Sequence, residues 1–285
     1  MLKYTLTGFA DEISPDLNVQ MDVIETLDIH HIEMRGVDGR NLCDYTLEEA
    51  AVVKARLDAR GIKLSAIGSP LGKILITDPF EPHFEKFCHA CDLAKLFETP
   101  YIRIFSFFIP KGEDPAIYRE EVMRRMSAFV EEAKRRGIIL LHENEKGIYG
   151  DIPERCLDLM EQFYGDNFKC TFDPANFVQC GVNVYPHAYE LLAPYIAYMH
   201  VKDAHLSDGH VTVAGRGDGG VKELLTAMSE AGFEGYLSLE PHLTNFVGFS
   251  DLEDDASSQL KEDAGNGAKL FAAAVAALRS LLINL

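Results

Sequence analysis

Short aliphatic runs alternate with longer amphipathic stretches along the whole chain. An aliphatic run that stops abruptly in charged residues is typical of a buried parallel strand whose end opens into a site, whereas apolar positions three and four residues apart indicate a helix. The run Ile-Ile-Leu-Leu-His-Glu-Asn-Glu at residues 138–145 shows this design most clearly. By the same pattern we predict strands at residues 4–9, 31–34, 62–67, 101–107, 138–145, 169–172, 196–201 and 236–240.

Helix-start and helix-stop signals lie between these strands. Ser14-Pro15-Asp16 begins a helix that runs to about residue 27, with proline early in its first turn. Thr46-Leu-Glu-Glu begins the next helix, which ends at Gly61. Further helices are predicted at residues 82–97, 114–136, 152–164, 187–192, 221–231 and, after a long loop from residue 241 to about 256, up to residue 283.

Eight strands that are each followed by a helix predict an α/β fold, a closed parallel (β/α)8 barrel. The length of 285 residues suits this fold, which typically takes about 250 residues. An open doubly wound sheet is the structural alternative, but it requires a Gly-rich phosphate loop after the first strand, and Gly8-Phe-Ala-Asp-Glu is not one. No linker, low-complexity tract or internal repeat divides the sequence, so residues 1–285 are predicted to form a single domain.

Composition narrows the class of protein and its surroundings. Apolar residues make up 47% and charged residues 25%, which permits a large core and disfavours disorder. A net charge of −18 repels phosphate backbones and anionic membranes, so neither nucleic acid nor a membrane is an expected partner. No apolar run approaches the roughly 20 residues of a membrane span, and the N-terminus has no signal-peptide pattern. We therefore expect a cytoplasmic protein.

Four successive predicted strands end in residues that can bind a metal. They are Glu143, Asp173, His200 and Glu240. In a (β/α)8 barrel all C-terminal strand ends face one mouth, so these side chains would meet there. Three carboxylates at one point would repel one another without a cation, and the oxygen-rich set favours one divalent ion, Mn²⁺ or Mg²⁺ first, with Co²⁺ or Zn²⁺ as alternatives. The simpler interpretation is that each is an isolated polar residue on the rim.

The motifs at these strand ends carry a family resemblance. Glu143-Asn-Glu, Asp173-Pro-Ala-Asn-Phe, His200-Val-Lys-Asp and Glu240-Pro-His resemble the sugar phosphate isomerase/epimerase family of the xylose-isomerase-like TIM-barrel superfamily. The resemblance implies one divalent metal held by these four residues and a small-molecule carbohydrate substrate. It also implies that Glu143 and Glu240 are the catalytic pair, one removing a proton next to a carbonyl and the other returning it on the opposite face through an enediolate.

Within its strand, Glu143 is the predicted ligand because alternation lets only every second side chain face the metal, and the family motif has the glutamate before asparagine. His142 should point outward toward the helices. Glu145 should lie beyond the strand.

Alternation places two more side chains beside the predicted ligands. Lys202 lies on the same face as His200, and His242 lies on the same side as Glu240. We predict that both bind substrate, with Lys202 stabilising an enediolate oxygen. The alternatives are a salt bridge between Lys202 and Asp203, and a hydrogen bond at the rim for His242.

Three further residues are candidates for substrate binding. Arg103 lies in an otherwise apolar run, where it is costly unless it binds a substrate oxyanion or a carboxylate such as Glu33. The resemblance suggests that Arg216 grips substrate hydroxyls, although an exposed loop arginine is the plainer interpretation. Asn176 stands where ketose epimerases of the superfamily usually have histidine, and its amide can hydrogen-bond but cannot act as a base. This departure argues against carrying over ketose specificity directly.

We therefore predict a divalent-metal-dependent isomerase or epimerase of a sugar or sugar derivative. The first alternative is a dehydratase of a keto-polyol, similar to inosose dehydratases, which would use the same metal and proton abstraction. The second is a metabolite-binding barrel without catalysis. The endonuclease branch of the superfamily is disfavoured, because the third and fourth strands end without the histidines that its metal cluster needs. Self-association into a homo-oligomer is common for barrels of this size.

Overall fold

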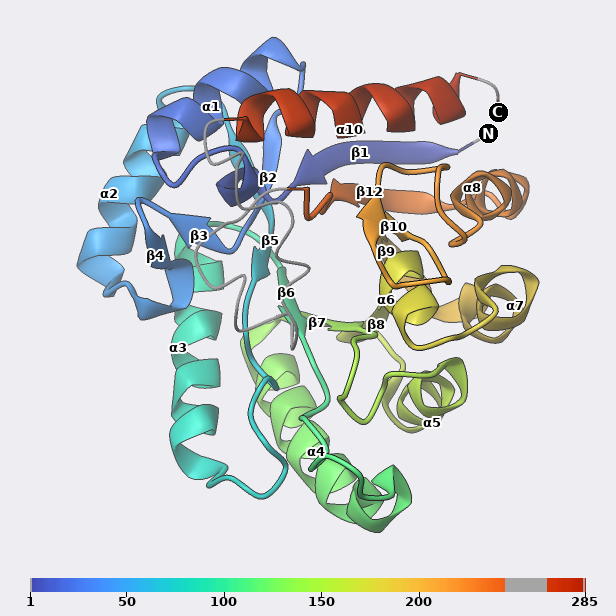
Figure 1. Cartoon of the computed structure of the whole chain (residues 1–285). Helices are drawn as coiled ribbons and strands as arrows, with labels where there is room; N and C mark the ends of the chain where they lie inside the picture. Colours follow the sequence, from blue (N-terminus) through green and yellow to red (C-terminus); the bar gives the residue numbers. More distant parts are fainter. Residues whose placement is uncertain (1, 244–265, 284) are drawn as a thin grey trace.

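Eight parallel strands form a nearly closed barrel in the computed structural model, which describes residues 2–243, 266–283 and 285 (Figure 1). Neighbouring strands follow the order β1-β12-β9-β8-β7-β6-β5-β2, and β1 packs beside β2, which brings the two ends of this series together. The strands are β1 (Lys3–Gly8), β2 (His31–Met34), β5 (Lys63–Gly68), β6 (Tyr101–Ile104), β7 (Ile139–Glu143), β8 (Phe168–Phe172), β9 (Ile196–Val201) and β12 (Glu234–Leu239). The predicted (β/α)8 barrel is confirmed, and the single-domain organisation stays a prediction.

Helices between the strands surround the barrel (Figure 1). They are α1 (Leu17–Thr26), α2 (Leu47–Asp58), α3 (Glu81–Leu96), α4 (Arg119–Arg136), α5 (Pro153–Phe163), α7 (Tyr189–Leu192), α8 (Val221–Glu230) and α10 (Gly267–Leu282). Asp16 accepts a hydrogen bond from the backbone N–H of Asn18 at the start of α1, and Thr46 and Glu49 form a capping box at the start of α2. The start of α2 lies where the sequence predicts it, whereas α1 begins later than predicted, because Asp16 is its N-cap and Pro15 therefore precedes the helix instead of lying in its first turn. Within the described part of the chain, no helix is long and apolar enough to cross a membrane.

The loops contain more structure than the sequence pattern predicts. Two antiparallel hairpins, β3 (Gly36–Val37) with β4 (Arg40–Asn41) and β10 (Asp203–Ala204) with β11 (Val211–Thr212), follow β2 and β9. The short helices are η1 (Ala10–Glu12), η2 (Leu42–Asp44), η3 (Pro115–Tyr118), α6 (Pro174–Gln179), η4 (Val184–Ala188) and η5 (Ala193–Tyr195). Elements of this size are too short to show a hydrophobic period, so only their turn residues are visible in the sequence. Part of the predicted loop at residues 241–256 lies outside the described residues.

Strand β6 ends earlier than predicted, at Ile104 instead of residue 107. The apolar run continues, but Phe105 and Phe108 donate their backbone N–H groups to the carbonyls of Leu71 and Ile74, at 2.8 and 2.9 Å. These partners lie in the loop between β5 and α3 and not in a neighbouring strand. The hydrophobic run therefore extends past the last ladder hydrogen bond, which is why the prediction was too long.

Two separate apolar clusters lie on the two faces of the barrel strands. Leu140 and Met199 belong to the main core, which the strands share with the helices. Ala66, Leu141 and Tyr198 form a smaller cluster inside the barrel. Consecutive residues of β7 and β9 thus alternate between the outside and the inside, as expected for strands. The same alternation decides which polar side chains at the strand ends face the mouth.

Candidate metal centre

The C-terminal ends of four neighbouring strands carry the predicted ligands. Glu143 is the last residue of β7, Asp173 follows β8, His200 lies near the end of β9 and Glu240 follows β12. These strands are adjacent in the barrel. The alternation that turns Leu141 into the barrel also turns Glu143 inward, two residues further along the strand.

The structure brings together all four side chains that the sequence predicts as metal ligands. His200 Nδ1 lies 3.0 Å from Glu143 Oε1, 3.1 Å from Glu240 Oε2 and 3.9 Å from Asp173 Oδ2. One ligand atom from each residue lies within 4.8 Å of all the others. Each of the four residues is at most 2% exposed. The cluster is therefore both compact and shielded from water.

This geometry fits a single divalent cation. Donor atoms that lie about 2.0–2.2 Å from one ion stand roughly 3–4 Å apart, and this is the spacing around His200 Nδ1. Although both atoms are buried, His200 Nδ1 and Asp173 Oδ2 make no well-aligned hydrogen bond to any residue that the structure describes. Buried polar atoms without aligned partners, at the centre of a carboxylate cluster, form an arrangement that a cation completes. Glu143, Asp173, His200 and Glu240 would hold it.

Without a cation, the cluster shifts the pKa values of its own members. Burial raises the pKa of Glu143, but His200 and Arg103 outweigh burial and lower the value to about 2. Burial raises the pKa of Asp173 to about 6, although Lys202 opposes the change. Burial lowers the pKa of His200, but neighbouring carboxylates, Glu143 first, raise it well above its ordinary value. The carboxylates thus favour a positive charge at the centre. A proton on His200 supplies this charge in the absence of a metal, and a bound metal ion would replace the proton.

Arg103 reaches the centre from β6. Its Nη1 donates to Glu143 Oε2 at 2.6 Å, and its guanidinium lies 4.5 Å from the ring centroid of Phe105. The predicted pairing of Arg103 with a carboxylate is confirmed, but Glu33, the example given, is wrong, because Glu143 takes the hydrogen bond. A buried arginine held in this way fixes the orientation of the carboxylate that it binds. Its predicted contact with substrate stays a prediction.

Asn176 and Asn144 connect two of the ligands. Asn176 donates through Nδ2 to Glu143 Oε1 at 3.2 Å and through its backbone N–H to Asp173 Oδ1 at 3.0 Å. The side chain of Asn144 exchanges two hydrogen bonds with the backbone of Asp173, at 2.8 and 2.9 Å. Because Asp173 caps α6 through Oδ1, its Oδ2 is left to face the cluster. The predicted substrate role of Asn176 also stays a prediction.

Lys202 lies beside the ligands, on the same face as His200. Its Nζ is 3.0 Å from Asp173 Oδ2 and 3.4 Å from Glu240 Oε2. Burial lowers the pKa of Lys202, but these carboxylates raise it well above its ordinary value. The alternative salt bridge with Asp203 is wrong. The carboxylate of Asp203 instead accepts hydrogen bonds from the backbone N–H groups of Gly215, Gly217 and Gly219, at 2.9, 3.0 and 2.9 Å.

His242 lies beside Glu240, as predicted, but not through strand alternation, because β12 ends at Leu239. Its Nε2 is 3.2 Å from Glu240 Oε1, and its backbone N–H donates to Glu12 Oε2 at 2.8 Å. The φ angle of His242 is 47°, a left-handed conformation that few residues other than glycine adopt. The hydrogen bond to Glu12 stabilises this conformation and keeps the imidazole next to Glu240.

Arg216 is not brought to the cluster. It is exposed in the loop after β11, where its backbone N–H donates to the carbonyl of Val213 at 3.1 Å. Its side chain makes no hydrogen bond or ion pair with the residues that the structure describes. Its predicted substrate role stays a prediction.

Two charged residues of the β2 segment belong to the site and were not predicted there. Glu33 contacts His200, with an Oε2–Nε2 distance of 3.1 Å. Arg35 donates from Nε to Asp11 Oδ2 at 2.8 Å and from Nη1 to Glu240 Oε1 at 3.1 Å. Their signal in the sequence is His-Ile-Glu-Met-Arg at residues 31–35, where charges occupy alternate positions of a short apolar run.

A second group of potential ligand atoms adjoins the first and shares Glu240. It consists of Glu12, Glu240 and His242, whose ligand atoms lie within 4.8 Å of one another. Arg35 already supplies a positive charge there, because its Nη2 is 3.4 Å from Glu12 Oε1 and its Nη1 binds Glu240. The centre around His200 is therefore the better candidate for a metal.

Comparison with known proteins agrees with this fold. A family model described as a xylose isomerase-like TIM barrel matches residues 21–274. The chain belongs to this family. No curated protein matches the sequence.

Several solved structures share the barrel over nearly its whole length. D-Allulose 3-epimerase from Methylomonas sp., in complex with D-allulose, has a TM-score of 0.74 at 13% identity and 98% coverage of both chains. The probable 3-DHS dehydratase AsbF from Bacillus anthracis has a TM-score of 0.68 at 18% identity, over 93% of this chain and 98% of its own. The IolI protein with a bound zinc atom has a TM-score of 0.70 at 16% identity, over 95% and 96%. Identities this low show the shared fold and leave the reaction open.

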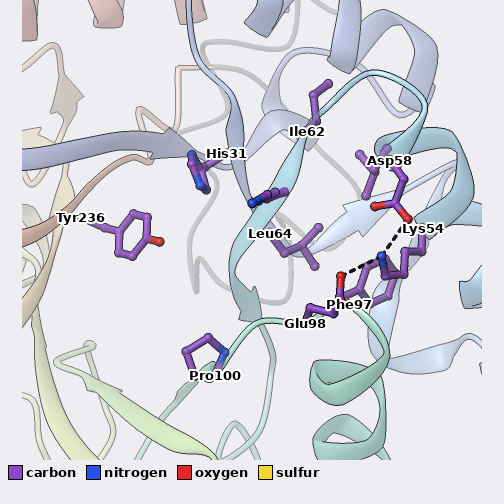
Figure 2. A pocket seen from close by; sticks show the side chains of 11 residues that line it. His31, Lys54, Asp58, Ile62, Leu64, Phe97, Glu98, Pro100 and Tyr236 are labelled. Carbon is purple, nitrogen blue, oxygen red and sulfur yellow. Dashed lines mark hydrogen bonds and ion pairs between the residues drawn. The ribbon is translucent and has the colours of Figure 1, made fainter.

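A cavity of about 470 Å³ lies at the opposite, N-terminal end of the barrel (Figure 2). It is lined by His31, Lys54, Leu57, Asp58, Ile62, Lys63, Leu64, Phe97, Glu98, Pro100 and Tyr236. Figure 2 shows Lys54 reaching both Asp58 and Glu98, with His31 and Tyr236 across the cavity. In TIM-barrel enzymes the active site lies at the other, C-terminal face. The cluster of Glu143, Asp173, His200 and Glu240 lies at that face.

Proposed function

We propose that this protein is a divalent-metal-dependent isomerase or epimerase of a small carbohydrate or sugar derivative. The observation that carries the proposal is the pair of buried glutamates, Glu143 and Glu240, which lie 3.0 and 3.1 Å from the same His200 nitrogen. Strands β8 and β9 separate β7 from β12, so the two glutamates approach the centre from different sides. Two carboxylates in these positions suit an exchange of protons on the two faces of one carbon.

A divalent ion held by Glu143, Asp173, His200 and Glu240 would polarise a carbonyl and a neighbouring hydroxyl of the substrate. The oxygen-rich ligand set favours Mn²⁺ or Mg²⁺. The zinc atom in the IolI structure keeps Zn²⁺ as an alternative, together with Co²⁺. The D-allulose in the Methylomonas epimerase supports ketoses as the first substrates to test.

The residues around the centre supply the proton transfer. One of Glu143 and Glu240 removes the proton next to the carbonyl, and the other returns a proton to the opposite face through an enediolate. Arg103, which donates to Glu143 at 2.6 Å, keeps that carboxylate in one orientation. Lys202, 3.4 Å from Glu240, is placed to stabilise an enediolate oxygen.

Dehydration is the second candidate function, and the buried ammonium of Lys202 is the observation that favours it. An acid next to the proton-abstracting carboxylate can protonate a hydroxyl as it leaves the neighbouring carbon. Isomerisation needs no such donor, because Glu143 and Glu240 already supply two proton-transferring groups beside the same nitrogen, and it is the preferred proposal.

Exchange with solvent deuterium distinguishes the two reactions. Metal-loaded protein is incubated in D₂O with a panel of ketoses and cyclic keto-polyols, and the products are followed by NMR and ultraviolet absorption. An isomerase or epimerase incorporates deuterium at the reacting carbon and keeps the hydroxyl groups. A dehydratase accumulates an unsaturated carbonyl compound. Protein treated with a chelator is the control, and exchange that survives chelation would contradict the proposed metal dependence.

A further inference from the structure

A layer of polar side chains lies inside the barrel, one step along the strands from the metal ligands. The hydroxyl of Thr7 is 2.7 Å from that of Ser65, which is 2.9 Å from the hydroxyl of Tyr198. Ser238 Oγ donates to Glu33 Oε2 at 2.6 Å. All five residues are at most 1% exposed. Branched apolar side chains usually fill the interior of such a barrel, so a polar layer in this position requires a reason.

Glu33 is the member of this layer that contacts a metal ligand. Its Oε2 and Oε1 lie 3.1 and 3.3 Å from His200 Nε2. Over residues 2–243 and 266–283, no lysine or arginine comes within ion-pair distance of this carboxylate. A buried carboxylate without such a partner costs stability, and an apolar side chain would fill the place at lower cost. The contact with His200 therefore accounts for the presence of a glutamate at position 33.

An irregularity in β5 lies beside this contact. The register between β2 and β5 shifts between Ile32 and Glu33, where Ile32 pairs with Leu64 but Glu33 pairs with Ala66. Ser65 of β5 is therefore the extra residue, and a bulge of this kind bends its strand and increases the local twist of the pair. Glu33 lies directly after the shift on β2, and its carboxylate contacts the imidazole of His200 on β9.

The contact determines which ring nitrogen of His200 carries a proton. Carboxylate oxygens accept hydrogen bonds, which assigns the proton of this contact to Nε2 of His200. The other ring nitrogen, Nδ1, faces Glu143 and Glu240 at 3.0 and 3.1 Å. With Nε2 protonated, Nδ1 can present its lone pair to a cation, and the carboxylate makes the imidazole a better donor.

We infer that Glu33 is a positioning residue that holds His200 in the tautomer and orientation that bind the cation through Nδ1. This inference rests on the metal site proposed above. Glu33 contacts Nε2 of the imidazole, whereas Glu143 and Glu240 lie beside Nδ1. It therefore acts on the cation only through His200.

Mn²⁺ affinity of the metal-stripped protein, measured by electron paramagnetic resonance titration, tests the inference. Loss of a carboxylate behind a histidine ligand typically weakens metal binding 10–100-fold. Glu33→Gln keeps one acceptor oxygen and loses the charge, so we expect binding about 10-fold weaker, and Glu33→Leu, which keeps no acceptor, about 100-fold weaker. Thr7→Val removes a hydroxyl of the same layer that does not touch His200, and it should change the affinity less than about twofold.

Nitrogen-15 NMR of the histidine rings separates positioning from a general loss of structure. In the Mg²⁺-loaded wild type, His200 should show a protonated Nε2 and an unprotonated Nδ1. In Glu33→Leu the proton should move toward Nδ1, a change that weakened packing alone would not produce. Urea unfolding of each metal-free variant checks that it is folded. If Glu33→Leu does not fold, the isosteric variant Glu33→Gln alone is used for the test.

The outcomes distinguish this inference from the proposed function. Weaker Mn²⁺ binding by both Glu33 variants, with an unchanged Thr7→Val control and the expected Nε2 proton, supports it. Wild-type affinity in the Glu33 variants, or a proton on His200 Nδ1 in the loaded wild type, overturns it while leaving the metal site intact. A wild-type protein that binds no Mn²⁺, Mg²⁺ or Zn²⁺ overturns the proposed function and this inference together.

Discussion

At the C-terminal mouth of the barrel Arg103, Glu143 and Lys202 are at most 3% exposed, whereas at the N-terminal end Lys54 and Glu98 form an ion pair whose side chains are 19% and 79% exposed. Both ends contain cations and carboxylates within hydrogen-bond distance of one another. The difference lies in burial and in the number of carboxylates that converge. The mouth collects three carboxylates around one imidazole nitrogen, and in the cavity at the other end Lys54 is already paired with Asp58 and Glu98 (Figure 2).

This difference bears on how much the charges at each end contribute to, or detract from, the stability of the fold. A surface ion pair costs little to form and contributes little, whereas a buried cluster of like charges destabilises the protein unless a ligand compensates for it. A cation bound at the mouth, as proposed, would offset that cost. In the N-terminal cavity the same residue types form ion pairs that solvent reaches.

Removing one carboxylate from the mouth should have the largest effect on activity. Glu240→Gln loses an acid/base group and should lower the rate of deuterium exchange by about 10²–10⁴-fold. Glu234→Gln, at the opposite end of the same strand, should stay within about twofold of the wild type. Exchange rates measured under the same metal concentration check this pair. If the exchange rate fell equally in the two variants, the two ends of the barrel would not differ in their contribution to activity.

Metal binding should stabilise the folded protein through the mouth alone. At a free Mn²⁺ concentration 100 times the dissociation constant, the free energy of unfolding should rise by about 2.7 kcal/mol, because the ion binds the folded state. Asp58→Asn, which removes a carboxylate of the N-terminal cavity, should show the same increase, and Asp173→Asn a smaller one. Urea unfolding with and without Mn²⁺ measures the increase, and an equal response of Asp173→Asn and wild type would contradict the assignment.

The stability of the metal-free protein should depend on pH through Asp173. Its folded pKa is about 6 against an ordinary 3.8, so the folded state binds this proton more tightly than the unfolded chain does. The corresponding stability is present below the ordinary value and is lost as the pH rises through about 6. Asp173→Asn should therefore gain on the wild type by on the order of 2 kcal/mol between about pH 4 and pH 7.

Urea unfolding of both metal-free proteins at several pH values measures that gain, with the exposed Asp58→Asn as control. A stability difference that stays constant with pH would show that Asp173 ionises as easily in the folded protein as in the unfolded chain.

The smallest effect is expected at the N-terminal end. Lys54→Ala removes the partner of Asp58 and Glu98, but exposed pairs are screened by solvent and should contribute less than about 1 kcal/mol to the free energy of unfolding. Urea unfolding checks the value, and Mn²⁺ affinity should not change. A loss of Mn²⁺ binding in this variant would mean that the two ends are coupled.

The sequence predicted the barrel and the convergence of Glu143, Asp173, His200 and Glu240 because both depend on local periodicity. β9 spans the predicted residues 196–201, and alternation within it places Tyr198, His200 and Lys202 on one face. The four strand ends are visible because each aliphatic run stops in a polar residue.

Contacts between side chains of different strands could not be predicted from local periodicity. Arg103 pairs with Glu143 and not with Glu33, because β7 is the strand next to β6 whereas β5 separates β6 from β2. The shift of register at Glu33 and the use of Asp203 to bind the loop around Gly217 depend equally on packing between distant segments.

Metal analysis of the purified protein tests the central claim most directly. Wild type and Glu234→Gln, reconstituted with excess Mn²⁺ and then desalted, should each retain about one divalent ion per chain, whereas Glu143→Gln and Glu240→Gln should retain much less. The account would be contradicted if the wild type retained no divalent ion, or if the four proteins retained equal amounts.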